Sequence, residues 1–175
     1  MSTHLHSLGP GDTLLFAAAI PSYNWTPNKN ERVALIAGGA GITPMYQLAQ
    51  GILNNPDDHT IIDLIYGVNS DSEILFKDQF TRWQTQFPQR FRATYVVRNP
   101  EPGSPHKGGT IDAGLLSTVL PNSKEHPGTS LKVFVCGPPP MQKTLTGGGG
   151  PMSRLCRSSG SLHNMGIPPS QIYTF

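Results

Sequence analysis

The chain has 175 residues, which suits one domain with a substantial core, or one domain and a fragment of a neighbour. Its 19 glycines and 17 prolines stay below the low-complexity range, so we expect them in the turns and irregular segments of a globular protein. Charged residues make up only 14% of the chain, the net charge is +2 and no basic cluster occurs, which argues against a nucleic-acid partner.

No stretch is long and apolar enough for a membrane span, and Met1–Gly11 lack the features of a signal peptide, so the chain as given is expected to be soluble. Cys136 and Cys156 are the only cysteines. They form no C-x-x-C pair and have no histidine at ligand spacing, so we expect neither a metal site nor a disulfide framework. A reducing compartment fits best.

Residues 1–30 do not look like the beginning of an independent domain. A turn signal, Pro10-Gly11-Asp12, precedes Thr13–Phe16, which are expected to form a short strand without a partner nearby in the sequence. Pro21–Asn30 contain two prolines and three asparagines and are expected to be a linker.

The strand around which the rest is organised is Val33–Ala37, an apolar run of the length that a strand buried on both faces requires. It stops where Gly38, Gly39 and Gly41 crowd together. A glycine-rich turn of this kind lets backbone N–H groups face an anion, most commonly a dinucleotide pyrophosphate. The alternative is a tight turn that binds nothing, since the loop matches neither G-x-G-x-x-G nor a P-loop.

A helix is expected directly after this turn. Thr43 is placed to be its N-cap and Pro44 its first residue, where the missing N–H costs nothing. Met45, Leu48 and Ile52 follow at helical spacing.

The second strand is expected over Thr60–Val68. Ser70 and Glu73 have the spacing of a capping box, which predicts that a second helix starts there. Four aromatic residues follow at helical spacing and are expected to pack on the sheet: Phe76, Phe80, Trp83 and Phe87.

The alternation of strands and helices continues to the end of the chain. Phe91–Arg98 are expected to be a strand with Val96 on the opposite face from Phe91, Ala93, Tyr95 and Val97. The remaining expectations are an irregular functional loop over Asn99–Gly109, a helix from Asp112 to Leu120, a strand over Leu131–Cys136 and a helix over Met141–Thr146. We also expect a divergent or flexible insert over 147–161, a helical turn over Leu162–Gly166 and a last strand over Gln171–Phe175.

Strands alternating with helices predict an α/β fold with a doubly wound parallel sheet. Ligands of such sheets bind at the carboxyl ends of the strands. Gly38–Thr43 and Cys136–Met141 both follow strand ends, so the two loops are expected at the same edge.

These two loops carry a resemblance to a known family. The stretches Ala37-Gly38-Gly39-Ala40-Gly41-Ile42-Thr43-Pro44 and Cys136-Gly137-Pro138-Pro139-Pro140-Met141, with Gly67-Val68-Asn69 between them, resemble the NADH-cytochrome b5 reductases of the ferredoxin-reductase-like flavoproteins. The likeness covers residues 1–146 and 162–175 and is greatest to the fungal mitochondrial form.

In that family a flavin-binding β-barrel precedes a ferredoxin reductase-like NAD-binding domain. The resemblance therefore implies a barrel remnant and linker over residues 1–30, with the NAD-binding domain over 31–175. Met1-Ser2 match the end of the family's flavin motif, so Ser2 is implied to contact FAD. The rest of the barrel signature is missing, so we expect a truncated product that binds FAD poorly and lacks full reductase activity.

The resemblance also implies a role for each matching residue. Cys136 and Thr43 are implied to be catalytic, the first close to the nicotinamide and the second where nicotinamide and flavin meet. The implied cofactor-binding residues are Gly38, Gly39, Gly41, Thr43, Pro44, Gly67, Asn69, Gly137, Pro138, Pro139 and Met141. Hydride transfer needs a donor and an acceptor held close and aligned, so it requires no acid–base pair.

Several residues depart from the family pattern or have a second interpretation. Ala40 replaces the usual threonine, and His106-Lys107-Gly108-Gly109 lack the family's tryptophan. Lys107 either reaches a phosphate or is a solvated loop lysine. Asp71 and Glu73 are expected to exclude a 2′-phosphate and so to favour NADH over NADPH, unless they serve only the helix N-terminus.

The implied function is that of an NADH-dependent flavoprotein oxidoreductase, in which hydride passes from NADH to FAD and electrons go on to cytochrome b5 or a similar haem protein. The alternatives are a reductase with another electron acceptor and a catalytically inactive nucleotide-binding module. The resemblance further implies a mitochondrial location, at the outer membrane or in the intermembrane space.

Overall fold

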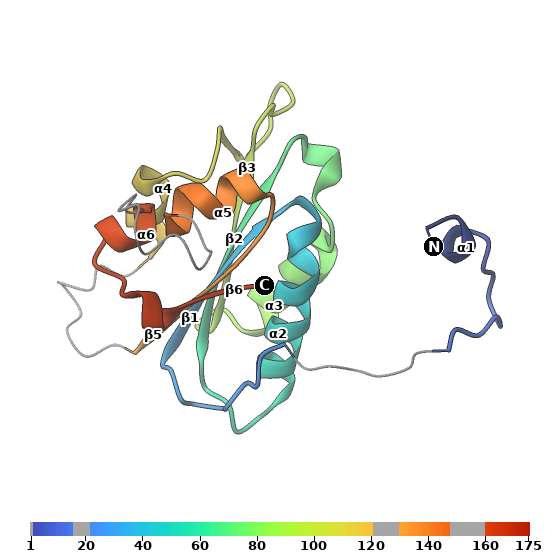
Figure 1. Ribbon diagram of the computed structural model, residues 1–175, viewed down its shortest axis with the longest axis horizontal. Coiled ribbons are helices and arrows are strands. Elements are labelled where there is room, and N and C mark those ends of the chain that lie inside the picture. Colours follow the sequence, from blue (N-terminus) through green and yellow to red (C-terminus); the bar gives the residue numbers. More distant parts are fainter. Residues whose placement is uncertain (1, 16–21, 121–129, 148–159) are drawn as a thin grey trace.

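The computed structural model describes residues 2–15, 22–120, 130–147 and 160–175. Its centre is a six-stranded, fully parallel sheet in the order β4-β3-β2-β1-β5-β6 (Figure 1). The strands are β1 (Arg32–Gly38), β2 (Ile61–Val68), β3 (Phe91–Val97), β4 (Lys107–Gly108), β5 (Leu131–Cys136) and β6 (Ile172–Thr174). The predicted parallel α/β sheet is confirmed. The strand order reverses at β1, so β1 and β5 flank the point where ligands of such sheets bind.

Helices cover both faces of the sheet (Figure 1). The helices are α1 (Ser2–His6), α2 (Ile42–Asn54), α3 (Lys77–Gln86), α4 (Ala113–Val119), α5 (Pro139–Thr146) and α6 (Ser161–Asn164), with 3-10 turns at Gly39–Gly41, Asp71–Glu73 and Pro169–Gln171. No helix of the described residues has the length and apolar character needed to cross a bilayer.

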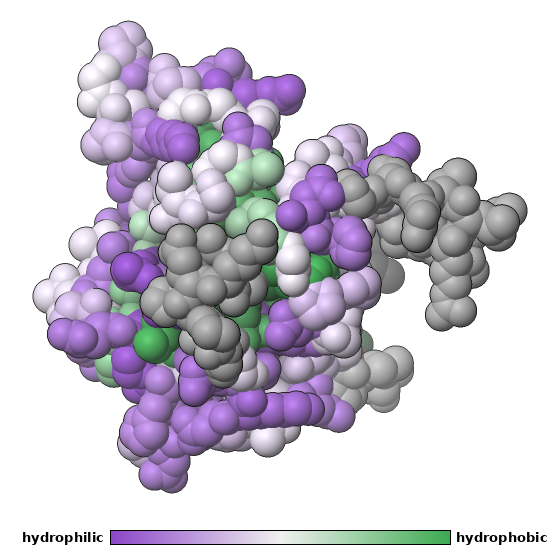
Figure 2. All heavy atoms as spheres, turned by 90° about the vertical axis from the view of Figure 1, so that its left-hand side faces the viewer, coloured by the Kyte–Doolittle hydropathy of each residue, from purple (hydrophilic) through white to green (hydrophobic). Residues whose placement is uncertain are grey.

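The two faces of the sheet carry separate apolar cores. One core joins α2 and α3 to residues such as Leu35, Leu64 and Phe134. The other joins α4, α5 and α6 to residues such as Ile36 and Val135. Figure 2 views the molecule from the left-hand side of Figure 1, the side on which α6 lies, and shows apolar residues framed by hydrophilic ones. The alternation of side chains along each strand therefore distributes the apolar residues between two layers, as a doubly wound sheet requires.

The segment before β1 differs from the sequence expectation in three respects. Residues 13–15 form no strand, Phe16 lies outside the described residues, and Ser2–His6 form a short helix that Figure 1 draws apart from the sheet. The expected linker, apart from Pro21, which is not described, lies on the domain. The Tyr23 ring meets Phe134 at a centroid distance of 4.8 Å, and Trp25 Nε1 donates to Asp58 Oδ2 over 2.7 Å.

Helix α2 begins earlier than predicted. A 3-10 turn winds the chain into the helix, so Gly41 is the N-cap and Thr43 lies within the first turn. The Thr43 hydroxyl donates to the Ala40 carbonyl over 3.0 Å and caps no N–H group. Pro44 consequently occupies the third helical position, where its missing N–H is still tolerated.

The predicted capping box at Ser70 is wrong. Ser70 caps no N–H group, and the Glu73 carboxylate accepts hydrogen bonds from the main chain and side chain of Asn69, each at 3.3 Å. The helix starts only at Lys77, after Phe76 takes a left-handed conformation with φ of 57°. Phe76 is therefore exposed and outside the core stripe, whereas Phe80 and Trp83 are buried as predicted.

Two later boundaries also shift. The loop expected to be irregular over Asn99–Gly109 contains β4, which pairs with β3. Helix α5 begins at Pro139, because two prolines fit its first turn. The Gly147 end of α5 meets Gly160, and the intervening residues of the expected insert, 148–159 with Cys156, lie outside the described residues.

Candidate functional site

The two glycine loops meet at the carboxyl ends of β1 and β5. The two strands are neighbours, and Ala37 stands opposite Cys136 in the register. A methyl group at Gly38 would lie 2.8 Å from the Met141 sulfur, and one at Gly137 would lie 3.1 Å from the Gly38 nitrogen. Glycine is needed at position 38 because the Met141 and Pro138 side chains fill the space beside it, and at position 137 because the Met141 methyl group and the Gly38 backbone do so.

The remaining glycines of the first loop serve different purposes. A methyl group at Gly41 would overlap the carbonyl oxygen of Cys136, so this glycine joins the start of α2 to the end of β5. Gly39 has φ of 52° and open space beside it. Its backbone is therefore accessible at the place where the strand order reverses.

A cavity of about 470 Å³ opens over these strand ends, within the range of small-molecule sites. The ends of β1, β2 and β3 contribute Gly38, Gly39, Gly67, Val68, Asn69, Val96 and Arg98. The segment before α4 contributes Gly109, Thr110 and Ile111, and the α5 region contributes Pro138, Pro140, Met141 and Thr144. The cavity thus runs from β1, at the reversal of strand order, across β2 to β3.

Six of the residues expected to bind cofactor line this cavity, namely Gly38, Gly39, Gly67, Asn69, Pro138 and Met141. Gly41, Cys136, Gly137 and Pro139 lie directly beside it at the junction of the two loops. Thr43 is exposed on the first turn of α2. Ser2 begins α1 and is separated from the cavity residues in the chain by the undescribed segment 16–21.

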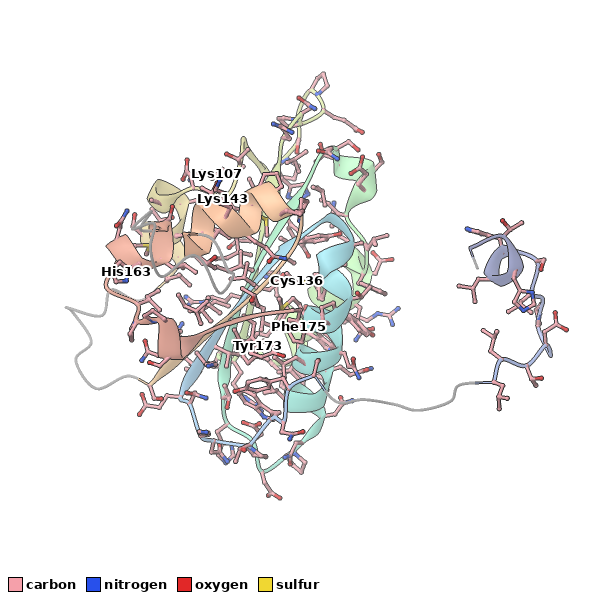
Figure 3. The ribbon with its side chains drawn as sticks, in the orientation of Figure 1. Lys107, Cys136, Lys143, His163, Tyr173 and Phe175 are labelled. Atoms are coloured by element: carbon pink, nitrogen blue, oxygen red, sulfur yellow. The ribbon has the colours of Figure 1, made fainter. Side chains whose placement is uncertain are left out.

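Pro44 lines a second, smaller cavity of about 340 Å³. Tyr23, Trp25, Leu48 and Phe175 form its apolar walls. Figure 3 labels Phe175 at the C-terminal end of the chain, and this residue lines the cavity together with Leu48 of α2. This second cavity is separate from the larger cavity that the glycine loops line.

Cys136 is a half-buried free thiol at the end of β5. Burial raises the pKa of this thiol, so the sulfur stays protonated near neutral pH. A neutral thiol is a poor nucleophile but a suitable apolar neighbour for an aromatic ring.

Asp71 ties the loop after β3 to the turn after β2. Its carboxylate accepts from the Ser104 hydroxyl over 2.6 Å and from the Glu101 amide over 2.9 Å. The Ser104 hydrogen bond, followed by that of Glu101, lowers the pKa of Asp71. His106 Nε2 lies 3.9 Å from the same carboxylate.

Among the cavity residues that sequence reasoning missed are Arg98, Thr110, Ile111 and Thr144. The alternation along β3 offered a signal for Arg98, since residues 96 and 98 share a face. The other three come to the cavity through the packing of segments distant in the sequence. Among the described residues, no group of histidine, cysteine, aspartate and glutamate side chains has the arrangement of a metal site.

Comparisons with known proteins agree with this geometry. The sequence profile of the oxidoreductase NAD-binding domain matches residues 35–146. The chain is 45% identical over its whole length to "NADH-cytochrome b5 reductase 2" of Phaeosphaeria nodorum and covers 52% of that protein. It is 42% identical to the protein of the same name in Neurospora crassa and covers 50% of it. The chain thus spans about half the length of these relatives.

Solved structures agree on the fold. The cytochrome b5 reductase domain of Ulva prolifera nitrate reductase superposes with a TM-score of 0.81 at 29% identity, over 99% of this chain and 64% of that one. The CS-b5R domains of human Ncb5or in the NAD+ form share the fold with a TM-score of 0.65 at 21% identity, over 89% of this chain and 40% of that one.

Proposed function

Because the chain belongs to the oxidoreductase NAD-binding domain family, we propose that it binds NADH in the cavity at the ends of β1, β2 and β3. The observation that carries this proposal is the meeting of two glycine loops at the reversal of strand order. Loops without side chains let a flat, charged ligand approach the backbone.

The residues around the cavity suit a dinucleotide. Gly38, Gly39 and Gly67 leave the strand ends bare, and Asn69 offers an amide at the far side. In the proposed arrangement, the nicotinamide lies toward Cys136 and Gly137 and the adenosine lies beyond β2, toward the end of β3, so that the pyrophosphate crosses the strand ends between them. The half-buried Cys136 excludes water on one side of the ring, and Gly137 with Pro138 fixes its approach.

We propose that the whole protein, of which this chain is part, is an NADH-cytochrome b5 reductase. NADH would supply a hydride and FAD would accept it, after which single electrons pass to cytochrome b5 or a similar haem protein. From this chain, Thr43 would border the flavin and Ser2 would contact it. Residues 31–175 are the proposed NAD-binding domain and residues 1–30 the proposed end of a flavin barrel with its linker.

The proposed nucleotide is NADH rather than NADPH. Asp71 and Glu73 place two carboxylates on the turn after β2, where a 2′-phosphate would be repelled. Both carboxylates also accept hydrogen bonds from neighbouring groups. These hydrogen bonds hold the two carboxylates in place, which supports a role in repelling a 2′-phosphate rather than in capping a helix N-terminus.

The proposed location is mitochondrial, at the outer membrane or in the intermembrane space. Its support is the resemblance to the fungal mitochondrial reductases. Subcellular fractionation with an antibody to this chain tests it. Recovery of the protein outside the mitochondrial fraction would refute this location.

Calorimetric titration of the purified 175-residue chain with NADH and NADPH tests the proposed site. We expect binding with preference for NADH, and binding of neither nucleotide would overturn the proposal. NADH–ferricyanide activity with added FAD is measured in parallel. Turnover would show that this chain alone suffices for catalysis, whereas selective binding without turnover would favour the nucleotide-binding module.

A further inference from the structure

Arg98 carries the only ionisable side chain among the described residues that line the large cavity. The other lining residues are glycine, proline, aliphatic side chains, methionine, threonine and one asparagine. Among the described residues, no carboxylate lies within ion-pair distance of Arg98. The cavity therefore has one positive charge that the described part of the chain does not neutralise.

The main chain holds Arg98 at this position. The Arg98 N–H donates to the Val68 carbonyl over 2.9 Å, which continues the pairing of β3 with β2 by one residue. Val96 aligns with Gly67 in the register and also lines the cavity. Because side chains alternate along a strand, Arg98 points to the same side as Val96.

Helix N-termini supply less of the positive charge here than in many nucleotide sites. Pro139 and Pro140 are the first two residues of α5 and have no N–H to donate. In α2, the Ile42 N–H bonds back to the Gly39 and Ala40 carbonyls, and Pro44 has no N–H. An anion over these strand ends therefore finds few free helical donors, and a side-chain cation has more to contribute.

The nearby lysines do not replace Arg98. Arg98, Lys107 on β4 and Lys143 on α5 are all exposed, but among these three only Arg98 lines the cavity. Figure 3 shows where the two lysines lie. Lys107, which the sequence offered as a phosphate contact, pairs with Val96 in the register but is not among the described residues that line the cavity. The planar guanidinium of Arg98 can also donate two parallel hydrogen bonds to a pair of phosphate oxygens, which a lysine cannot do.

We infer that Arg98 binds the pyrophosphate of the dinucleotide. The two phosphates are the only anionic groups of NADH, and Arg98 is the only cation that the described part of the chain brings to the cavity wall. Parallel strands lie about 4.8 Å apart, so β1 and β3 are separated by roughly 10 Å. A dinucleotide that lies across the strand ends from β1 to β3 brings its central phosphates within reach of this side chain. The inference rests on the proposed NADH site and assigns one of its binding residues.

The test compares Arg98→Gln and Arg98→Lys with the unaltered chain, and Lys107→Gln serves as the matched loss of a charge outside the cavity. NADH and NADPH are titrated by calorimetry at low and high salt, after circular dichroism has established that each variant is folded. We expect Arg98→Gln to weaken NADH binding about tenfold to a hundredfold. The NADH affinity of Arg98→Lys should lie between those of Arg98→Gln and the unaltered chain. Lys107→Gln should bind NADH as tightly as the unaltered chain.

Salt gives a second readout. High salt should weaken NADH binding by the unaltered chain more than by Arg98→Gln, because the variant lacks the charge pair that salt screens. Equal NADH affinities of the unaltered chain and folded Arg98→Gln would overturn this inference and leave the NADH site standing. Weakened binding of NADPH alone would also overturn it, by placing Arg98 at a 2′-phosphate. Failure of the unaltered chain to bind NADH would instead overturn the proposed function.

Discussion

The backbone of Gly41 lies directly against the carbonyl group of Cys136, the last residue of β5. A methyl group at position 41 would overlap the Cys136 oxygen and lie 2.9 Å from the Gly137 nitrogen. These are backbone atoms at the end of a central strand, so they cannot rotate away as a flexible side chain would. The start of α2 and the end of β5 are therefore fixed to each other at the point where both glycine loops begin.

Gly41→Ala should consequently destabilise the fold and weaken NADH binding together. Forcing a methyl group into this contact is expected to cost about 1–3 kcal/mol in the free energy of unfolding. Gly51→Ala is the matched control, since Gly51 lies in the same helix with open space beside it and should gain up to about 1 kcal/mol. Urea unfolding measures both variants. Equal stability of the two would show that the contact at Gly41 relaxes easily.

Asp63 links three neighbouring strands through two ion pairs. The side chain is almost fully buried in β2, with Arg32 of β1 at 2.6 Å and Arg92 of β3 at 3.0 Å. Asp63→Ala leaves Arg32, whose side chain is only 19% exposed, without its partner and should cost about 3–5 kcal/mol. Arg92 is 61% exposed, so Arg92→Ala should cost less than about 1 kcal/mol. Denaturant unfolding that ranks the two variants in the opposite order would contradict this account.

The sheet and its two apolar layers could be predicted because the strands are buried on both faces. Val33–Ala37 are a continuous apolar run and Leu131–Cys136 are interrupted only by Lys132. Glycine follows both runs, and β1 and β5 match them closely. Asp112 was also a reliable signal, since its side chain accepts the Leu115 N–H as the N-cap of α4. In these segments, local preference and tertiary packing favour the same conformation.

The helix starts near the site could not be predicted because tertiary contacts decide them. The close approach of Gly41 to Cys136 moves the start of α2 ahead of Thr43, which local capping preference favoured. Glu73 bonds to Asn69 rather than to Ser70, so the expected helix start becomes a short 3-10 turn. Arg98 became a site residue only when the packing of α5 and residues 109–111 enclosed the end of β3.

Asp58 attaches the segment before β1 to the domain and should make stability depend on pH. Burial raises the pKa of Asp58, but the hydrogen bonds from Thr60, Trp25 and the Asn28 region together outweigh burial and lower it. The stabilisation is therefore present above the unfolded pKa and is lost as the pH falls through the lower, folded pKa. We expect Asp58→Asn to lose less stability between about pH 5 and pH 3 than the unaltered chain.

Tryptophan fluorescence during thermal unfolding at each pH measures this effect. Asp57→Asn is the control, because Asp57 is exposed and the hydrogen bonds in which Asp57 takes part use its main chain. The control should follow the pH dependence of the unaltered chain. If Asp58→Asn also follows it, another group is responsible for acid unfolding.

Gly147 and Gly160 lie in contact, so the two ends of the predicted insert already meet. A methyl group at Gly160 would overlap the Gly147 nitrogen. Deleting residues 148–159 and joining these two glycines should therefore leave the sheet and the large cavity intact. We expect the melting temperature to change by no more than a few degrees and the NADH affinity to stay within about twofold. Loss of soluble, folded protein would show that the deleted residues are part of the fold.

Cys136 should react slowly with iodoacetamide at neutral pH, because burial raises its pKa and keeps the thiolate fraction small. The rate should rise as the pH increases toward this raised pKa. A Cys156→Ser background isolates Cys136, and a Cys136→Ser chain reports on Cys156 as the control. If the nicotinamide lies beside Cys136, saturating NADH should slow alkylation of Cys136 several-fold and leave that of Cys156 unchanged. Mass spectrometry of timed samples measures both rates, and equal rates at Cys136 with and without NADH would place the ring elsewhere in the cavity.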